Sequence, residues 1–182
     1  IMGFRNVFGI LGMLIALNGG FMLTAVPFSI YYNESVWPLL NSAIISIVLG
    51  LTTWAAMRWR NRRELSKKEG YLVVALGWVT MSVFGMMPFI FSGSKEFIHD
   101  AFFETMSGYT TTGASILNDI ESLPKGILFW RSLTQWIGGM GIIVLTIALL
   151  PMLGVGGMQL FIAEAPGISP DKLKPRIADT AK

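Results

Sequence analysis

Residues 97–115 read FIHDAFFETMSGYTTTGAS, and this stretch decides which membrane fold the chain can form. No charged residue lies between Glu104 and Asp119, a gap too short for the roughly 20 apolar residues that cross a bilayer as a helix. An apolar segment of that length is typical of a re-entrant, interfacial or core helix. We therefore expect a half-span helix over about 97–110, which enters the membrane without crossing it.

The residues after this half-helix form the candidate functional segment. Thr110, Thr111 and Thr112 are consecutive and are followed by Gly113. Because β-branched residues favour extended backbone, we expect the chain to be extended here. Extended backbone at membrane depth is tolerated only where protein buries it or where it lines a water-filled path. The alternative is an ordinary extracellular loop with a threonine-rich turn.

The composition places the chain in a membrane. Only 14% of its 182 residues are charged and 53% are hydrophobic, whereas about 25% of a soluble domain is charged. So few charges cannot cover the surface of a soluble globule, which disfavours a soluble enzyme. The high hydrophobicity excludes a disordered chain, and the absence of cysteine excludes a disulfide scaffold.

Other charge-free gaps are long enough to span a membrane. Each exceeds roughly 20 residues, and together they predict spanning helices near 6–29, 36–57, 70–92 and 129–151. The half-span falls between the third and the fourth of these helices. The predicted fold class is therefore an all-α integral membrane protein, with two leading transmembrane helices and one helix–pore loop–helix repeat that resembles a potassium channel.

Basic residues set the expected orientation and help to divide the chain. Residues 1–68 contain the leading helices and a basic loop, 69–152 contain the repeat, and 153–182 form a linker into the next repeat. By the positive-inside rule the basic loop is cytoplasmic, and so is the N-terminus. An alternative role for the basic cluster is binding to anionic membrane lipid or to a cytoplasmic partner. The cluster comprises Arg58, Arg60, Arg62, Arg63, Lys67 and Lys68.

The chemistry expected of the threonine segment is cation binding by backbone oxygen. A half-helix that enters from outside points its partly negative C-terminal end at the membrane centre. The carbonyl groups of Thr110, Thr111, Thr112 and Gly113 can then replace the hydration shell of a cation, with the Thr110 hydroxyl as a further ligand. Potassium is large and weakly hydrated, and we expect it at Thr111, Thr112 and Gly113. A divalent-cation site is not expected, because 105–118 contains no carboxylate.

Two charged residues flank this segment. Glu104 lies within the expected half-helix, where an ionisable group is functional by default. It either faces the outer mouth and attracts cations or, as we favour, braces Arg131. Arg131 lies at the start of the fourth predicted helix. Its side chain either snorkels to the membrane interface or pairs with Glu104 or Asp119, and such a pair would support the ion-binding segment 110–113 as a filter. The neighbouring Trp130 is expected to anchor this helix end at the interface.

A family resemblance appears at the same residues. SGYTTTGAS at 107–115, between two spanning helices, resembles the first repeat of the Trk/Ktr/HKT superfamily of potassium transporters. RSLTQWIGGMGIIVLTIALLPMLGVGGMQLFIAEAPG at 131–167 is similar to the Trk-type membrane subunit. The resemblance implies that four such repeats in one polypeptide surround one pore, with Gly113 as the filter glycine of this repeat. It also implies a homodimer of the full protein in a bacterial inner membrane, regulated by a cytoplasmic nucleotide-binding ring.

These observations predict a potassium-conducting pore module, with transport either passive or coupled to another ion. The alternative is a non-conducting membrane scaffold that binds a cytoplasmic regulator. An intramembrane enzyme is not expected, because the chain lacks cysteine and metal-ligand spacing. Neither an organic cofactor nor nucleic acid is expected, and the glycines at 154–157 lack the rest of a nucleotide-binding motif. One filter segment cannot surround an ion, so we expect a fragment of a longer protein, and the alternative is assembly of four copies.

Overall fold

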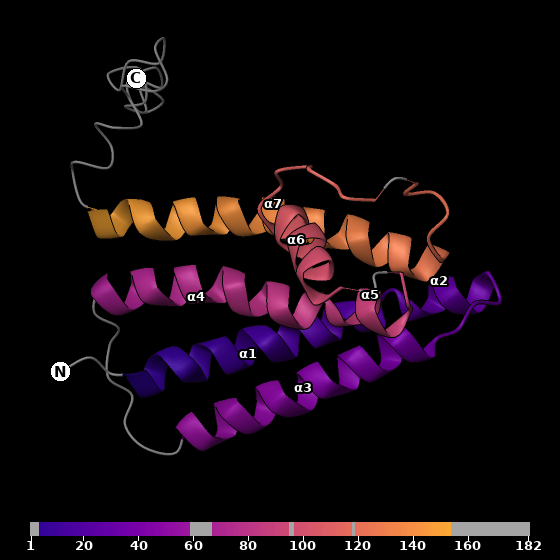
Figure 1. Ribbon diagram of the computed structural model, residues 1–182. Coiled ribbons are helices and arrows are strands. Elements are labelled where there is room, and N and C mark those ends of the chain that lie inside the picture. Colours follow the sequence, from indigo (N-terminus) through magenta and orange to yellow (C-terminus); the bar gives the residue numbers. More distant parts are fainter. Residues whose placement is uncertain (1–3, 59–66, 95–96, 118, 154–182) are drawn as a thin grey trace, which may run out of the picture. The chain divides into compact units, whose positions relative to one another are not determined.

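All regular secondary structure in the described part of the chain is helical (Figure 1). The computed structural model describes residues 4–58, 67–94, 97–117 and 119–153. It divides into two units, 1–140 and 141–182, and the described part of the second unit is the end of one helix. The predicted all-α class is confirmed. The expectations for the basic-loop residues 59–66 and for residues 154–182 lie outside the described residues.

Proline divides two of the predicted spans into a long helix and a short one. Pro27 and Pro88 each lie in the first turn of a short helix, where their missing N–H groups need no partner. The helix pairs are α1 (Phe4–Leu23) with α2 (Val26–Tyr31), and α4 (Lys67–Gly85) with α5 (Met87–Phe91). The stretches Arg5–Tyr31 and Glu69–Phe91 are long and apolar enough to cross a membrane, in agreement with the predicted first and third spans.

The leading helices α1 and α3 approach each other closely through glycine. α3 covers Trp37–Arg58, and its Trp37–Met57 portion is likewise long and apolar enough to cross a membrane. A Cβ atom on Gly12 would lie only 2.8 Å from the carbonyl oxygen of Gly50. Small residues allow membrane helices to pack at this distance. α1 also contacts α4, so it adjoins both its leading partner and the first helix of the repeat (Figure 1).

The predicted half-span is a short helix, α6 (Ile98–Tyr109), which agrees to within one residue with the expected 97–110. The following helix, α7, covers Lys125–Leu153 and contains the predicted fourth span. Its 29 residues make it about 43 Å long at 1.5 Å per residue. That α7 crosses a membrane stays a prediction. The described part of the chain between α6 and α7 has no regular structure.

One apolar core joins the leading helices to the repeat. Its buried side chains come from α1, α3, α5, α6, α7 and the α1–α2 junction, so the half-helix packs against both groups of helices. The predicted division of the chain at residues 68 and 152 stays a prediction. The core residues are Met22, Ala25, Leu39, Ala43, Phe89, Ala101, Ile127 and Trp130.

Candidate functional site

The half-helix α6 ends in a tight turn formed by the first two threonines of the candidate segment. Thr110 has helical dihedral angles, and Thr111 has a φ of +55°. The N–H of Thr111 donates to Gly108 O (3.0 Å), and the N–H of Thr112 donates to Ser107 O (3.1 Å). This pair of bonds is the Schellman motif, in which glycine usually occupies the left-handed position. A β-branched residue there is an outlier that stores strain.

This turn corrects the expectation of extended backbone from Thr110 onward. The prediction was wrong for Thr110 and Thr111, because the orphan carbonyl groups at the end of α6 capture the next N–H groups and bend the chain. Irregular backbone begins at Thr112. The Thr110 hydroxyl is also engaged: it donates to Met106 O (2.8 Å) and lies 2.8 Å from the Thr112 hydroxyl.

The candidate segment is exposed and its carbonyl groups are available. Thr110, Thr111, Thr112 and Gly113 all lie on the surface of the described structure. Within that structure their carbonyl oxygens accept no hydrogen bond. Gly113 has a φ of +76°, a conformation that glycine adopts without strain, and no described atom lies within 4 Å of the position of a Cβ on it. Four backbone oxygens in sequence are therefore open to a ligand.

Glu104 anchors the returning chain behind this segment. Its side chain is 1% exposed, and its Oε1 accepts a hydrogen bond from Arg131 Nε at 2.7 Å. The Ser115 hydroxyl donates to both carboxylate oxygens (3.0 and 2.9 Å), and the N–H of Ile116 donates to Oε2 (3.1 Å). A buried charge is tolerated only when it is paired and hydrogen-bonded in this way. The predicted pairing of Glu104 with Arg131 is present, and the Glu104 side chain is buried in the described structure.

A second bond closes the loop. The Ser107 hydroxyl donates to the carbonyl oxygen of Ala114 at 2.6 Å. The candidate segment 110–113 therefore lies between two anchored points, the end of α6 and the pair Ala114–Ser115. The sequence did not predict this bond, because nothing in the sequence around a helical serine indicates that it bonds to a residue seven positions later.

Two glycines bring α6 and α7 into direct contact. A Cβ atom on Gly138 would overlap the backbone of Tyr109, and one on Gly108 would overlap the Thr134 hydroxyl. Gly138 therefore allows the close packing of α7 against the end of α6. At Gly139 no described atom lies within 4 Å of the position of a Cβ, so this neighbouring glycine is not part of that contact.

The position of the Trp130 side chain differs from the expectation. Trp130 was predicted to anchor a helix end at the membrane interface, but its side chain is fully buried. Its indole N–H donates to the carbonyl oxygen of Gly85 at 2.9 Å. The prediction was wrong because proximity to a helix end places a tryptophan along the helix but does not say which face it occupies. Here the face is turned toward α4 and α6.

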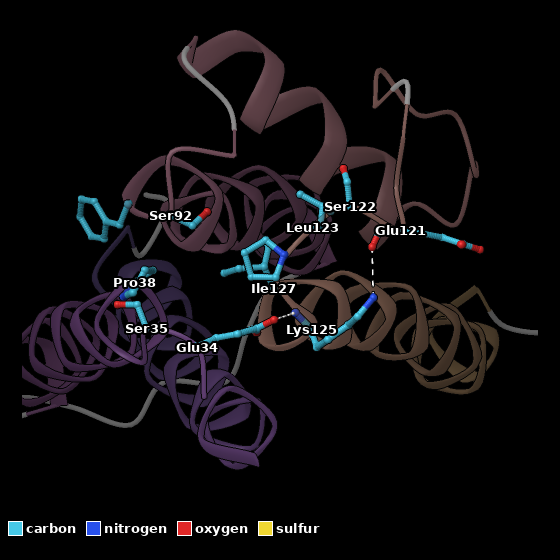
Figure 2. Close-up of a pocket in the computed structure, with 11 residues that line it drawn as sticks. Glu34, Ser35, Pro38, Ser92, Glu121, Ser122, Leu123, Lys125 and Ile127 are labelled. Atoms are coloured by element: carbon cyan, nitrogen blue, oxygen red, sulfur yellow. Dashed lines mark hydrogen bonds between the residues drawn. The ribbon is translucent and has the colours of Figure 1, made fainter. Parts of the chain in front are cut away.

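The N-terminal end of α7 is capped by a residue from the loop between α2 and α3. Glu34 Oε1 accepts a hydrogen bond from the N–H of Lys125 at 2.8 Å (Figure 2). Glu34 Oε2 accepts one from the N–H of Gly126 at 3.2 Å. A carboxylate suits the positive end of a helix and satisfies two of its orphan N–H groups. Beside it lies a cavity of about 570 Å³. Its lining includes Ser35, Ser92, Glu121 and Lys125 (Figure 2).

Side chains that ligate metals are sparse in the described ranges. They contain no group of three or more His, Asp and Glu side chains that could hold a metal ion. His99 is largely exposed and lies 3.2 Å from its neighbour Asp100.

Fold and site together define a class: helical membrane proteins in which a half-helix and an anchored, open backbone segment lie between two long helices. Sequence comparison shows to which family within this class the chain belongs. The chain belongs to the TrkH family, described as cation transport proteins, whose family model matches residues 38–182. This is a family of transport proteins and not of enzymes.

Individual relatives agree. The chain is 46% identical to the Trk system potassium uptake protein TrkH of Salmonella typhimurium, over 100% of this chain and 38% of that protein. It is 36% identical to the Trk system potassium uptake protein TrkG of Escherichia coli, over 98% of this chain and 37% of that protein. The crystal structure of the potassium transporter TrkH from Vibrio parahaemolyticus matches with a TM-score of 0.78 and 36% identity, covering 98% of this chain and 35% of that one. The chain thus spans a little over a third of the length of these relatives.

Proposed function

We propose that this chain supplies one of about four pore repeats of a potassium transporter, and that the carbonyl oxygens of Thr110, Thr111, Thr112 and Gly113 form its part of the ion filter. The observation that carries the proposal is the open backbone segment, anchored at both ends, at the C-terminal end of a buried half-helix. Carbonyl groups held in this way can replace the hydration shell of K⁺, and the helix end contributes partial negative charge. We place the ion at Thr111, Thr112 and Gly113.

In this proposal Glu104 and Arg131 support the filter and do not bind the ion. Arg131 neutralises the carboxylate, so Glu104 adds little net charge to the ion path, while its oxygens hold Ser115 and Ile116. The positions of the carbonyl groups then depend on a rigid bond network. Rigid networks of this kind specify a single arrangement when every member is satisfied.

The proposal includes the setting of the whole protein. The chain belongs to a multi-pass membrane protein, and we place it in a bacterial inner membrane with its N-terminus in the cytoplasm. The partners proposed are the remaining repeats of the same polypeptide, a second copy in a homodimer, a cytoplasmic nucleotide-binding regulatory ring and membrane lipid. The names of the relatives, which refer to a Trk system of potassium uptake, support the proposal of a regulatory partner. Labelling of single cysteines placed beside Arg5 and Asn33 tests the orientation, because the chain contains no native cysteine.

The decisive test of the filter is Gly113→Ser in the full-length protein. Gly113 has a φ of +76°, so a side chain strains the backbone where its carbonyl group must face the ion. We expect a several-fold fall in the preference for K⁺ over Na⁺, measured as ion flux in liposomes. Uptake in cells that lack their own potassium uptake systems, with and without residues 110–113, separates transport from a scaffold role.

A matched control is available in the same chain. Gly93 also has a positive φ (+69°) and open space around the position of a Cβ, but it lies in the loop after α5. Gly93→Ser should therefore carry the same backbone strain and leave ion preference unchanged. Normal ion preference in Gly113→Ser, with normal amounts of folded protein, would contradict the proposed filter.

A further inference from the structure

A buried asparagine of the leading helix reaches the residue directly before the candidate filter. Asn18 lies on α1, within the apolar stretch Arg5–Tyr31, and its side chain is fully buried. Its Oδ1 accepts a hydrogen bond from the Tyr109 hydroxyl at 2.5 Å, and its Nδ2 donates to the carbonyl oxygen of Met81 at 3.2 Å. A carbonyl group can only accept, so the amide must turn its NH₂ group toward Met81 and its oxygen toward the tyrosine.

Tyr109 is enclosed on several sides. It is the last residue of α6, and its side chain is fully buried. A Cβ atom on Gly85 of α4 would lie 2.9 Å from the edge of its ring, and a Cβ atom on Gly138 of α7 would overlap its backbone. Among the described hydrogen bonds, the Tyr109 hydroxyl makes its bond with Asn18. The contacts at Gly85 and Gly138 leave little space around Tyr109, and the hydrogen bond fixes the position of its hydroxyl group.

The position of Tyr109 determines where the filter begins. Thr110 follows it directly, and the turn through Thr111 and Thr112 is built on the carbonyl groups of Gly108 and Ser107. A shift of the last turn of α6 therefore moves the open carbonyl groups with it. A buried hydrogen bond fixes such a position more narrowly than apolar packing, because its energy falls steeply with distance and angle.

We propose that Asn18 is a positioning residue for ion selectivity, through which the leading helix α1 holds Tyr109 and thereby sets the filter carbonyls. This inference rests on the proposed filter at 110–113, and it gives the leading helix α1 a role in selectivity beyond membrane anchoring. Asn18 does not touch the ion. It acts through one bond that joins residues 91 positions apart in the sequence.

The test uses Asn18→Leu, Tyr109→Phe and the double variant in the full-length protein. Tyr109→Phe removes a single oxygen atom and keeps the ring that packs against Gly85. Each single variant should reduce the preference for K⁺ over Na⁺ by about three- to tenfold, a loss of about 0.7–1.4 kcal/mol in ion discrimination. The double variant should lose no more than either single variant, because all three lack the same bond.

Ser46→Ala is the matched control. Ser46 is a buried polar residue on α3 whose hydroxyl has no hydrogen-bond partner among the described residues. Its removal tests the effect of changing a buried polar group in the leading helices without breaking a bond to α6. Its ion preference should equal that of the unchanged protein.

The outcomes separate this inference from the proposed function. If Gly113→Ser alters ion preference while Tyr109→Phe does not, the filter stands and the positioning role is overturned. Equal losses of K⁺ and Na⁺ flux in Tyr109→Phe, with their ratio unchanged, also overturn it, because they indicate general destabilisation. If Gly113→Ser leaves ion preference unchanged, the filter itself fails and the inference falls with it. Should Asn18→Leu fail to accumulate, Tyr109→Phe decides alone.

Discussion

The seam between α1 and α3 and the contact between α6 and α7 both bring helices close together. The described side-chain hydrogen bonds around the two contacts differ. In the seam, Gly12 and Gly50 remove the side chains that would keep the helices apart. The hydroxyl groups of α3 that have described partners bond within their own helix, as Ser42 does with the carbonyl oxygen four residues earlier. The close approach at these two glycines is a packing contact, which is not directional.

Around α6, by contrast, buried polar side chains bond across the fold. Glu104, Ser107 and Tyr109 bond to residues 27, 7 and 91 positions away. Glycine is present here too, at Gly108 and Gly138, but it serves to bring the bonding groups within reach. Side-chain bonds to distant residues are thus gathered around α6. Directional bonds appear where open carbonyl groups need a defined position.

Removal of the buried carboxylate should have the largest effect on stability. Glu104→Ala leaves Arg131 buried without its partner and frees Ser115 and Ile116. We expect the free energy of unfolding to fall by about 3–5 kcal/mol, measured by thermal unfolding of the full-length protein in detergent. The double variant Glu104→Leu/Arg131→Met should lose much less, because it leaves no unpaired charge. An unchanged unfolding temperature in Glu104→Ala would show that directional bonds do not hold this region.

A glycine variant in the α1–α3 seam and one at the α6–α7 contact should differ in their effect on ion preference. Gly138→Ala and Gly50→Ala each force a Cβ atom into the backbone of a neighbouring helix, Tyr109 in the first case and Ala16 in the second. Both should lower stability by about 1–3 kcal/mol. Only Gly138→Ala should also reduce the preference for K⁺ over Na⁺, because only it displaces the start of the filter. Equal ion preference in the two variants would contradict the expectation that only the α6–α7 contact affects the filter.

Gly139→Ala provides the control for this pair. No described atom lies within 4 Å of the position of its Cβ, and the residue sits inside α7. Replacement of a helical glycine by alanine on an open face gains up to about 1 kcal/mol of helix propensity. Stability should therefore be unchanged or slightly higher, with normal ion flux.

A small gain in stability is expected at the filter itself. Thr111 has a φ of +55°, where a Cβ atom crowds the following carbonyl oxygen. Thr111→Gly should relieve this strain and raise the free energy of unfolding by about 0.5–1 kcal/mol. The added backbone freedom should at the same time reduce ion preference. A loss of stability, seen in the same thermal unfolding measurement, would show that Thr111 is not strained.

Local sequence features predicted much of the site. The charge-free gap and the apolar run placed the half-helix to within one residue, and the isolation of Glu104 in that run pointed to the pair with Arg131. The turn at Thr110 and Thr111 was missed. β-Branched residues favour extended backbone, but here the unpaired carbonyl groups at the helix end outweigh that preference.

The sequence by itself determined which segments are helical, which of them are apolar enough for a membrane, and where the half-helix ends. These follow from composition and from charges within a few residues of each other, so the information is local. The tertiary structure decided which polar groups meet: Asn18 with Tyr109, Glu34 with the N-terminus of α7, and Trp130 with Gly85. These partners lie 45 to 91 residues apart, and the close approach of helices at glycines brings them together. A polar residue within an apolar segment of the sequence is expected to need a hydrogen-bond partner when it is buried. Only the packing of the helices determines which residue that partner is.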